Sequence, residues 1–469
     1  MRVVLSILLL VSSIQLSCAL DAEHVNGKLE STVIEAMEHN KLGSALLGVK
    51  VIDAGSGETV LAFNSDKNVM PASNTKLLTA AAALLSLGKD YRYKTTVYYD
   101  HKHQDEIHNL YIDFSSDPSL TSKDLSYLLA ALQKQGIHSI SGNVYLVNSV
   151  FQGRDYPINQ SQSDSVFGYG VPSSAYNLNE NQVILNLKTQ EHAFNAQQIT
   201  GETITYHNHL VAADNEMLKT CQFDASMDKS NTLSLAGCLP RGDYTFKFAI
   251  VNPKLMMKNV LRSKLTELGL KLKGDIQITT TTKDVDLEEL TSHVSAKLSV
   301  LIEHMLQTSD NLYAQSFLRT MGDKLFHVGS IVSGKNALLK ILQEDLALNT
   351  DNIQLEDGAG MSQNDLLNAD FLTQLLYNMK LQKAFKVFVR GLPIYGQSGS
   401  LASRTEKALI GKVIAKTGTG TTSIALSGYL SAKNGKEYIF SILLGNLLES
   451  QRALASKLQD QILLALYQE

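Results

Sequence analysis

Apolar residues along the chain alternate between helical spacing and strand-like runs, which predicts a mixed α and β protein. Residues 29–39 place apolar side chains on one helical face. Residues 45–51 and 59–63 are typical of two strands joined by the turn at 53–57, a predicted hairpin. An Ala-rich helix then begins near Ser73. The start of the chain therefore predicts a helix, a hairpin and a second helix.

From about Tyr91 the pattern becomes strand-rich. Residues 93–100, 109–114 and 143–147 carry the aromatic and β-branched residues typical of strands, around an amphipathic helix at 122–135. The order helix, Gly, apolar residue, Gly, strand occurs at 132–144 and again at 265–276, which indicates a repeated unit. Between the copies, the Gly- and Ser-rich region at about 151–249 is predicted to be β-rich and nested in the insertion.

The last third of the chain predicts a compact α+β unit. Helices are expected at 298–306, after Ser309 and near 337–342. Strands at 413–416, 424–430 and 437–444 precede a terminal helix at about 450–467. Three adjacent strands before a last helix predict an antiparallel sheet faced by helices.

Composition narrows the class of protein. A chain of 469 residues is too long for one ordinary core, so two or three domains are expected. Hydrophobic residues make up 44% and charged residues 19%, a globular composition. The net charge of −4 and the lack of a block of like charge argue against nucleic acid as a partner.

The first residues have the pattern of an export signal. Met1 and Arg2 precede an almost wholly apolar run at 3–11, and small residues at 17–19 predict cleavage after Ala19. Lipidation at Cys18 and a retained membrane anchor are the lesser alternatives, so a peripheral association with the membrane stays open. The remaining pair, Cys221 and Cys238, suits a disulfide in an exported chain, with two buried thiols as the alternative. We expect the protein in the periplasm or another extracytoplasmic space.

Ser73 and Lys76 form the first candidate for chemistry. Residues three apart on a helix share a face, so the hydroxyl and the amine can meet. A serine at a helix start also lies where free N–H groups favour developing negative charge. A surface lysine beside a capping serine would give the same spacing, so this pair alone decides little.

Two further motifs follow in order: Ser309-Asp310-Asn311 at a break between helices, and Lys416-Thr417-Gly418-Thr419 at a strand near the C-terminus. Together with Ser73-x-x-Lys76, they resemble the motif set of penicillin-binding proteins and serine β-lactamases. More than two hundred residues separate Lys76 from Ser309. This insertion resembles the low-molecular-mass class C penicillin-binding proteins, the D-alanyl-D-alanine carboxypeptidase/endopeptidases. Other matching stretches are 116–120, 169–175, 179–181, 357–362, 398–401 with Arg404, and 428–429.

The resemblance implies an α+β fold. It comprises a penicillin-recognising, transpeptidase-like domain, an antiparallel sheet faced by helices, with a large β-rich insertion of one or two sub-domains. We expect the signal peptide at 1–19 and the catalytic domain at 20–90 and 290–469. The inserted sub-domains are expected at 91–289, with about 150–250 as the nested part. The chain departs from the family pattern at Asn148, Gln315 and Gly420, which leaves substrate contacts in the insertion unassigned.

The resemblance also implies roles. Ser73 would be the nucleophile and Lys76 its base, while Ser309 would relay the proton to the leaving amine and Asn311 would bind the substrate amide. The Lys416 charge and the Thr417 and Thr419 hydroxyls would hold a terminal carboxylate. The strand through Gly418 would pair with an extended peptide, and the N–H groups of Ser73 and Thr419 would form an oxyanion hole.

The predicted function is a serine DD-peptidase that acts on D-Ala-containing peptidoglycan peptides and is acylated by β-lactams, without metal or other cofactor. The alternatives are a serine β-lactamase and a non-catalytic peptidoglycan-binding module. A metal hydrolase using His101, His103 and His108, or His207 and His209, is disfavoured because these histidines lie in polar, loop-like stretches. The sequence sets neither the oligomeric state nor the preference between carboxypeptidase and endopeptidase.

Overall fold

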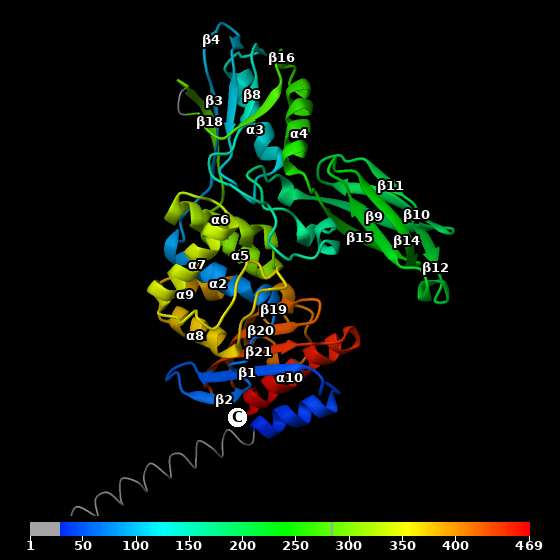
Figure 1. Ribbon diagram of the computed structural model, residues 1–469, viewed down its shortest axis with the longest axis vertical. Helices are drawn as coiled ribbons and strands as arrows, with labels where there is room; N and C mark the ends of the chain where they lie inside the picture. Colours follow the sequence, from blue (N-terminus) through cyan, green and yellow to red (C-terminus); the bar gives the residue numbers. More distant parts are fainter. Residues whose placement is uncertain (1–28, 283–284) are drawn as a thin grey trace, which may run out of the picture.

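The computed structural model describes residues 29–282 and 285–469. The predicted signal peptide at 1–19 lies outside these residues. Figure 1 shows an elongated molecule in which the first and last described segments of the chain build the lower body. The middle of the chain builds an upper body and a separate sheet at its side. Within the described ranges, no helix combines the length and the apolar character needed to cross a membrane.

The lower body is built on a five-stranded antiparallel sheet with the order β19-β20-β21-β1-β2. Both faces of the central strands are buried: Val49 and Val51 of β1 join one core, and Ile52 joins the other. The helix over residues 29–39 and α10 cover the first face, while a layer of helices from residues 75–86 and 298–391 covers the second (Figure 1). The strands are β1 (Leu46–Asp53), β2 (Thr59–Phe63), β19 (Val413–Thr419), β20 (Ile424–Ser431) and β21 (Glu437–Gly445), and α10 spans Arg452–Gln468.

Helix α2 (Thr75–Ser86) is the centre of the helical layer, and its residues 75–84 are all buried. The run Ala80–Ala83 has no side chain beyond Cβ, so neighbouring helices can approach closely on every side. The predicted antiparallel sheet faced by helices is therefore confirmed. The surrounding helices are α5 (Leu298–Thr308), α6 (Asn311–Phe326), α7 (Ile331–Leu346), α8 (Ala369–Lys380) and α9 (Phe385–Gly391).

The upper body contains the repeated unit. Helices α3 (Ser122–Lys134) and α4 (Pro253–Glu267) each end before a glycine with positive φ: 70° at Gly136 and 66° at Gly269. The strands that follow pair in parallel across the copies, β7 with β16 and β8 with β17. The repeat in the sequence thus corresponds to two units side by side. The four paired strands are β7 (Ser139–Ile140), β8 (Val144–Val147), β16 (Lys271–Leu272) and β17 (Ile276–Thr279). The sheet that contains β8 also includes β3 (Lys94–Tyr99), β6 (Leu110–Asp113) and β18 (Glu288–Val294). The sheet that contains β7 also includes β4 (Lys102–His103) and β5 (Glu106–Ile107).

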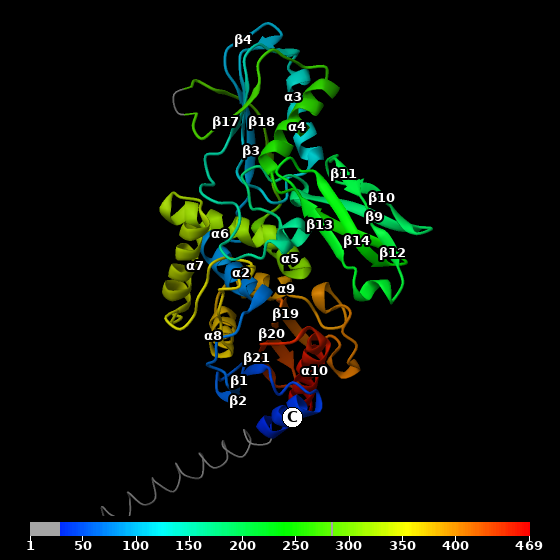
Figure 2. The same ribbon diagram turned by 45° about the vertical axis from the view of Figure 1, so that its right-hand side comes forward.

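The side sheet has seven strands and lies beside the upper body in both views (Figures 1 and 2). Cys221 and Cys238 form a disulfide there, as predicted. Strand β18 crosses the predicted boundary between the insertion and the catalytic domain, at residues 289 and 290. The division of the chain into domains stays a prediction. The strands are β9 (Gln182–Gln190), β10 (Ala193–Thr200), β11 (Tyr206–Asn208), β12 (Val211–Ala213), β13 (Phe223–Met227), β14 (Leu233–Pro240) and β15 (Asp243–Ala249).

Candidate active site

Ser73 lies in a single 3₁₀ turn, Ala72–Asn74, directly before α2. The sequence places it at the helix start, and the structure places it one turn earlier. The backbone around it is crowded, because a Cβ on Gly360 would come within 1.8 Å of the Ala72 carbonyl oxygen. The turn holds the Ser73 hydroxyl beside the first turn of α2, where Lys76 lies.

Lys76 is completely buried and its amine nitrogen has three oxygen neighbours. These are Ser73 Oγ at 2.8 Å, Asn311 Oδ1 at 2.5 Å and the Ala359 carbonyl at 2.8 Å. The amide oxygen and the carbonyl can only accept, so in a neutral lysine they take both N–H groups and leave the lone pair for the Ser73 hydroxyl. Burial lowers the pKa of Lys76 to about 7, against the opposing charges of Asp357 and Asp310.

Ser309 and Asn311 lie where α5 ends and α6 begins. Ser309 closes α5 in the left-handed conformation, with φ of 60°, and Asp310 caps α6 by accepting from the Tyr313 N–H at 3.1 Å. This sharp turn directs the Ser309 hydroxyl and the Asn311 amide toward the cleft, where Asn311 Oδ1 accepts a hydrogen bond from Lys76. The amide nitrogen of Asn311 donates to the Tyr169 carbonyl at 2.7 Å, a contact from the inserted segment.

Lys416 is the second buried amine of the site. Its Nζ donates to Ser309 Oγ at 2.9 Å and to the Thr417 carbonyl at 3.0 Å. Burial, with the nearby charge of Lys76, holds the pKa of Lys416 well below its usual range. The Thr417 hydroxyl lies 2.6 Å from Ser400 Oγ, so Ser400 is a neighbour of the site for which the motifs gave no role.

The predicted residues surround one cleft of about 550 Å³. Ser73, Ser309, Asn311, Thr417 and Thr419 line it, and the two lysines lie buried beside it. Gly418 is in the adjoining backbone, where a Cβ would come within 2.5 Å of the Pro71 carbonyl oxygen. Tyr169 and Met361 also line the cleft, from stretches that matched the family without an assigned role. Sequence reasoning missed further lining residues from distant segments, among them Met70, Asp164, Gln363 and Arg452.

The loop at 357–362 supports Lys76, and the carboxylate of its first residue, Asp357, holds the loop together. One carboxylate oxygen accepts from the N–H groups of Ala359 and Gly360, each at 2.6 Å. The other accepts from Met361 at 2.9 Å and Ser362 at 2.6 Å. These four bonds fix the loop whose Ala359 carbonyl binds Lys76. The stretch matches the family, but its supporting role needed the structure.

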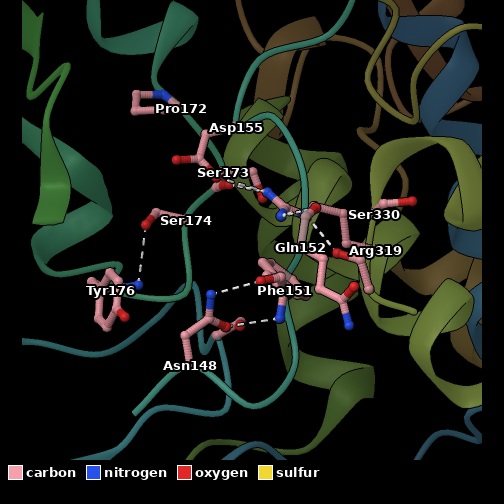
Figure 3. Close-up of polar contacts among 12 residues, drawn as sticks. Asn148, Phe151, Gln152, Asp155, Pro172, Ser173, Ser174, Tyr176, Arg319 and Ser330 are labelled. Carbon is pink, nitrogen blue, oxygen red and sulfur yellow. Dashed lines mark hydrogen bonds and ion pairs between the residues drawn. The ribbon is translucent and has the colours of Figure 1, made fainter. Parts of the chain in front are cut away.

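Arg319 of α6 anchors the inserted loop that forms the other wall (Figure 3). It is fully buried and its guanidinium donates to Gly329 O and Gln152 O, both at 3.0 Å, and to Ser173 O. It also reaches the Asp155 carboxylate at 3.2 Å and stacks 4.1 Å from the Phe151 ring centre. No spacing in the sequence pointed to this contact.

Residues 29–466 match the D-Ala-D-Ala carboxypeptidase 3 (S13) family. The chain belongs to this family. A D-alanyl-D-alanine carboxypeptidase of Actinomadura sp. (strain R39) is 27% identical over 89% of this chain and 80% of its own length. The D-alanyl-D-alanine carboxypeptidase DacB of Haemophilus influenzae is also 27% identical, over 81% of each chain.

The S13 assignment agrees with a solved structure. Penicillin binding protein 4 of Haemophilus influenzae superposes with a TM-score of 0.84 and 26% identity, covering 93% of this chain and 99% of that protein. The match extends through the insertion as well as the lower body. It confirms the fold class expected from the motifs, and this chain is a member of the carboxypeptidase class of enzymes.

Proposed function

We propose that this chain is a serine-type DD-peptidase in which Ser73 is the nucleophile. The observation that carries the proposal is the 2.8 Å contact between Ser73 Oγ and the buried Lys76 amine. A neutral Lys76 accepts the hydroxyl proton as Ser73 Oγ bonds to the carbonyl carbon of the substrate. The C–N bond then breaks, and the leaving amine takes a proton through Ser309. Water hydrolyses the resulting ester and restores Ser73.

The geometry of β19 supports binding of an extended peptide. β19 is an edge strand, and its Ala415 N–H donates outward to the Pro393 carbonyl at 3.0 Å. N–H groups alternate in direction along a strand, so those of Thr417 and Thr419 point to the same side. A substrate can add there as a further strand, with its terminal carboxylate at Lys416 and the two threonine hydroxyls. The N–H groups of Ser73 and Thr419 then form the oxyanion hole.

The proposed substrates are peptidoglycan peptides that end in or contain D-Ala, with both carboxypeptidase and endopeptidase action. β-Lactams acylate the same serine; the Haemophilus influenzae penicillin binding protein 4 has been solved in complex with a β-lactam. We propose that the protein acts on these substrates in the periplasm or another extracytoplasmic space, after export by its signal peptide. A peripheral contact with the membrane would be compatible with that location.

The test is covalent labelling of the purified mature protein with a fluorescent penicillin. Ser73→Ala is compared with Ser86→Ala, a serine at the far end of the same helix whose hydroxyl only donates to the Ala82 carbonyl. We expect a stable label on the parent and on Ser86→Ala, and none on Ser73→Ala. Release of D-Ala from a pentapeptide, and cleavage of a cross-linked dimer, then measure the two activities.

Other outcomes would overturn the proposal. A label that forms and is lost rapidly would identify a β-lactamase. No label on the folded parent would favour a non-catalytic peptidoglycan-binding module, and a label that persists on Ser73→Ala would place the nucleophile elsewhere.

A further inference from the structure

A His and two carboxylates meet where the inserted segment contacts the helical layer. Glu180 comes from the turn Asn179–Asn181, His304 from α5 and Asp310 from the cap of α6. Their ligand atoms all lie within 4.8 Å of one another. The inserted segment and the junction of α5 with α6 thus bring an imidazole and two carboxylates together beside, but outside, the proposed catalytic residues.

The distances in this trio suit a shared ion. His304 Nε2 lies 3.4 Å from Glu180 Oε1 and 3.7 Å from Asp310 Oδ2, longer than a charge-assisted hydrogen bond of about 2.7–2.9 Å. The Nε2 atom is buried and has no hydrogen-bond partner. Around Zn²⁺ with bonds of about 2.0–2.1 Å, tetrahedral ligand atoms are spaced by roughly 3.4 Å. The two distances from His304, 3.4 and 3.7 Å, are close to that value.

Neighbouring groups orient the three ligands. Asp310 uses Oδ1 to accept from the Tyr313 N–H, which leaves Oδ2 for His304. The Tyr313 ring packs against the imidazole with 4.4 Å between ring centroids. Hydrogen bonds fix the residues on either side of Glu180. Asn179 Oδ1 accepts from the Ser122 N–H at 3.0 Å, and Asn181 Nδ2 donates to the Pro172 carbonyl at 2.9 Å. Such surrounding contacts are what hold metal ligands in place.

The site has room and charge for a dication. All three residues line a pocket of about 590 Å³, which gives water access to a fourth coordination position. One imidazole with two carboxylates is a donor set that suits Zn²⁺.

We propose that Glu180, His304 and Asp310 form a binding site for one Zn²⁺ ion, with water as the fourth ligand. The ion would join the inserted segment to the turn that carries Ser309 and Asn311. The sequence had offered other histidines for a metal, at 101–108 and 207–209. In the described part of the chain, Glu180, His304 and Asp310 form the group of three potential ligands whose ligand atoms lie within 4.8 Å of one another.

The test is isothermal titration of the untagged, metal-free mature protein with Zn²⁺. We expect one ion per chain, and His304→Gln and Glu180→Gln should each weaken binding at least tenfold. His293→Gln is the matched control. His293 also lies between two carboxylates, but through opposite ring nitrogens: Nδ1 is 3.5 Å from Asp124 and Nε2 is 3.9 Å from Asp117. A single ion cannot use both, so this variant should bind as the parent does.

Titration with Co²⁺ on the unaltered protein provides a second readout that needs no variant to fold. Tetrahedral binding should give intense visible absorption, whereas the spectrum of aqueous Co²⁺ alone would overturn the proposal. So would Zn²⁺ binding that survives in folded His304→Gln, or no binding at all. Ser73→Ala should bind Zn²⁺ like the parent, so failure of the metal site and failure of the peptidase proposal are distinguishable.

Discussion

The amine nitrogen of Lys76 lies 2.8 Å from the hydroxyl oxygen of Ser73, and the pKa of that amine is lowered to about 7. Only the neutral amine can accept the proton. Acylation by a penicillin should therefore slow about tenfold for each pH unit below 7 and level off above about pH 8. Stopped-flow measurement of the acylation rate between pH 5 and 9 checks this profile.

Lys76→Arg should remove the dependence of the acylation rate on pH, because a guanidinium stays protonated. The acylation rate should fall by about 10²–10⁴, the usual contribution of a general base. Lys340→Arg is the control, since Lys340 lies on the surface of α7 and pairs with Glu344. A pH-independent rate in the parent would contradict the role given to Lys76.

Asp357→Asn should change both stability and pH dependence. The new NH₂ group would replace an oxygen that accepts two N–H groups, and each unsatisfied donor costs about 1–3 kcal/mol. The Asp357 charge also raises the pKa of Lys76, so its loss should move the acid limb of acylation to lower pH. Chemical denaturation and the pH–rate profile measure the two effects.

Asp365→Asn is the matched comparison for Asp357→Asn. Burial, with the nearby charge of Asp357, holds the pKa of Asp365 well above its usual range. The charges that raise the pKa of Lys76 are those of Asp357 and Asp310, so the acid limb should stay in place in Asp365→Asn. An equal shift in both variants would show that Asp357 does not act on Lys76 through its charge.

Gly360→Ala should destabilise the protein more than Gly88→Ala. Both glycines have positive φ, 79° and 84°, so both variants bear a left-handed backbone cost of about 1–2 kcal/mol. A Cβ on Gly88 meets nothing within 4 Å, whereas one on Gly360 would overlap the Ala72 carbonyl beside Ser73. Gly360→Ala should also slow acylation. Thermal melts and penicillin labelling measure both, and equal losses in the two variants would rule out the clash.

The parts of the site carried by local motifs could be predicted from the sequence, and the parts that support them could not. Ser73 and Lys76 are three residues apart, so helical geometry alone brings them together. The sheet and the repeated unit were also predictable, because apolar periodicity and the paired glycines are local signals. By contrast, Asp357 binds backbone N–H groups of a loop that has no periodic pattern. Its charge acts on the pKa of Lys76 only because the fold brings the two residues near each other.

The trio of Glu180, His304 and Asp310 illustrates the same limit. Its members come from two sides of a contact between the insertion and the helical layer, and no spacing in the sequence links them. The close approach of Gly360 to the 3₁₀ turn that carries Ser73 is likewise a contact between segments far apart in the sequence. Long-range packing determines these features, and a single sequence carries no direct signal of it.

Arg319→Lys should loosen the wall of the cleft while leaving the proposed catalytic residues in place. Lysine keeps the charge but lacks the planar fork, so some of the carbonyls of Gly329, Ser173 and Gln152 would lose their donor. Each buried loss costs about 1–3 kcal/mol. The anchored loop leads to Tyr169, whose carbonyl holds the Asn311 amide. A peptide that contacts this wall should bind more weakly.

The expected signature of Arg319→Lys is a lower melting temperature, a raised KM for a peptidoglycan peptide and a smaller change in kcat. Arg241→Lys is the control, because Arg241 is exposed on the side sheet and donates to the Glu191 carbonyl. Acylation by a small penicillin should change less than peptide turnover, since the penicillin contacts less of the wall. Equal losses in kcat and penicillin acylation would instead mean that Arg319 supports the Lys76 region itself.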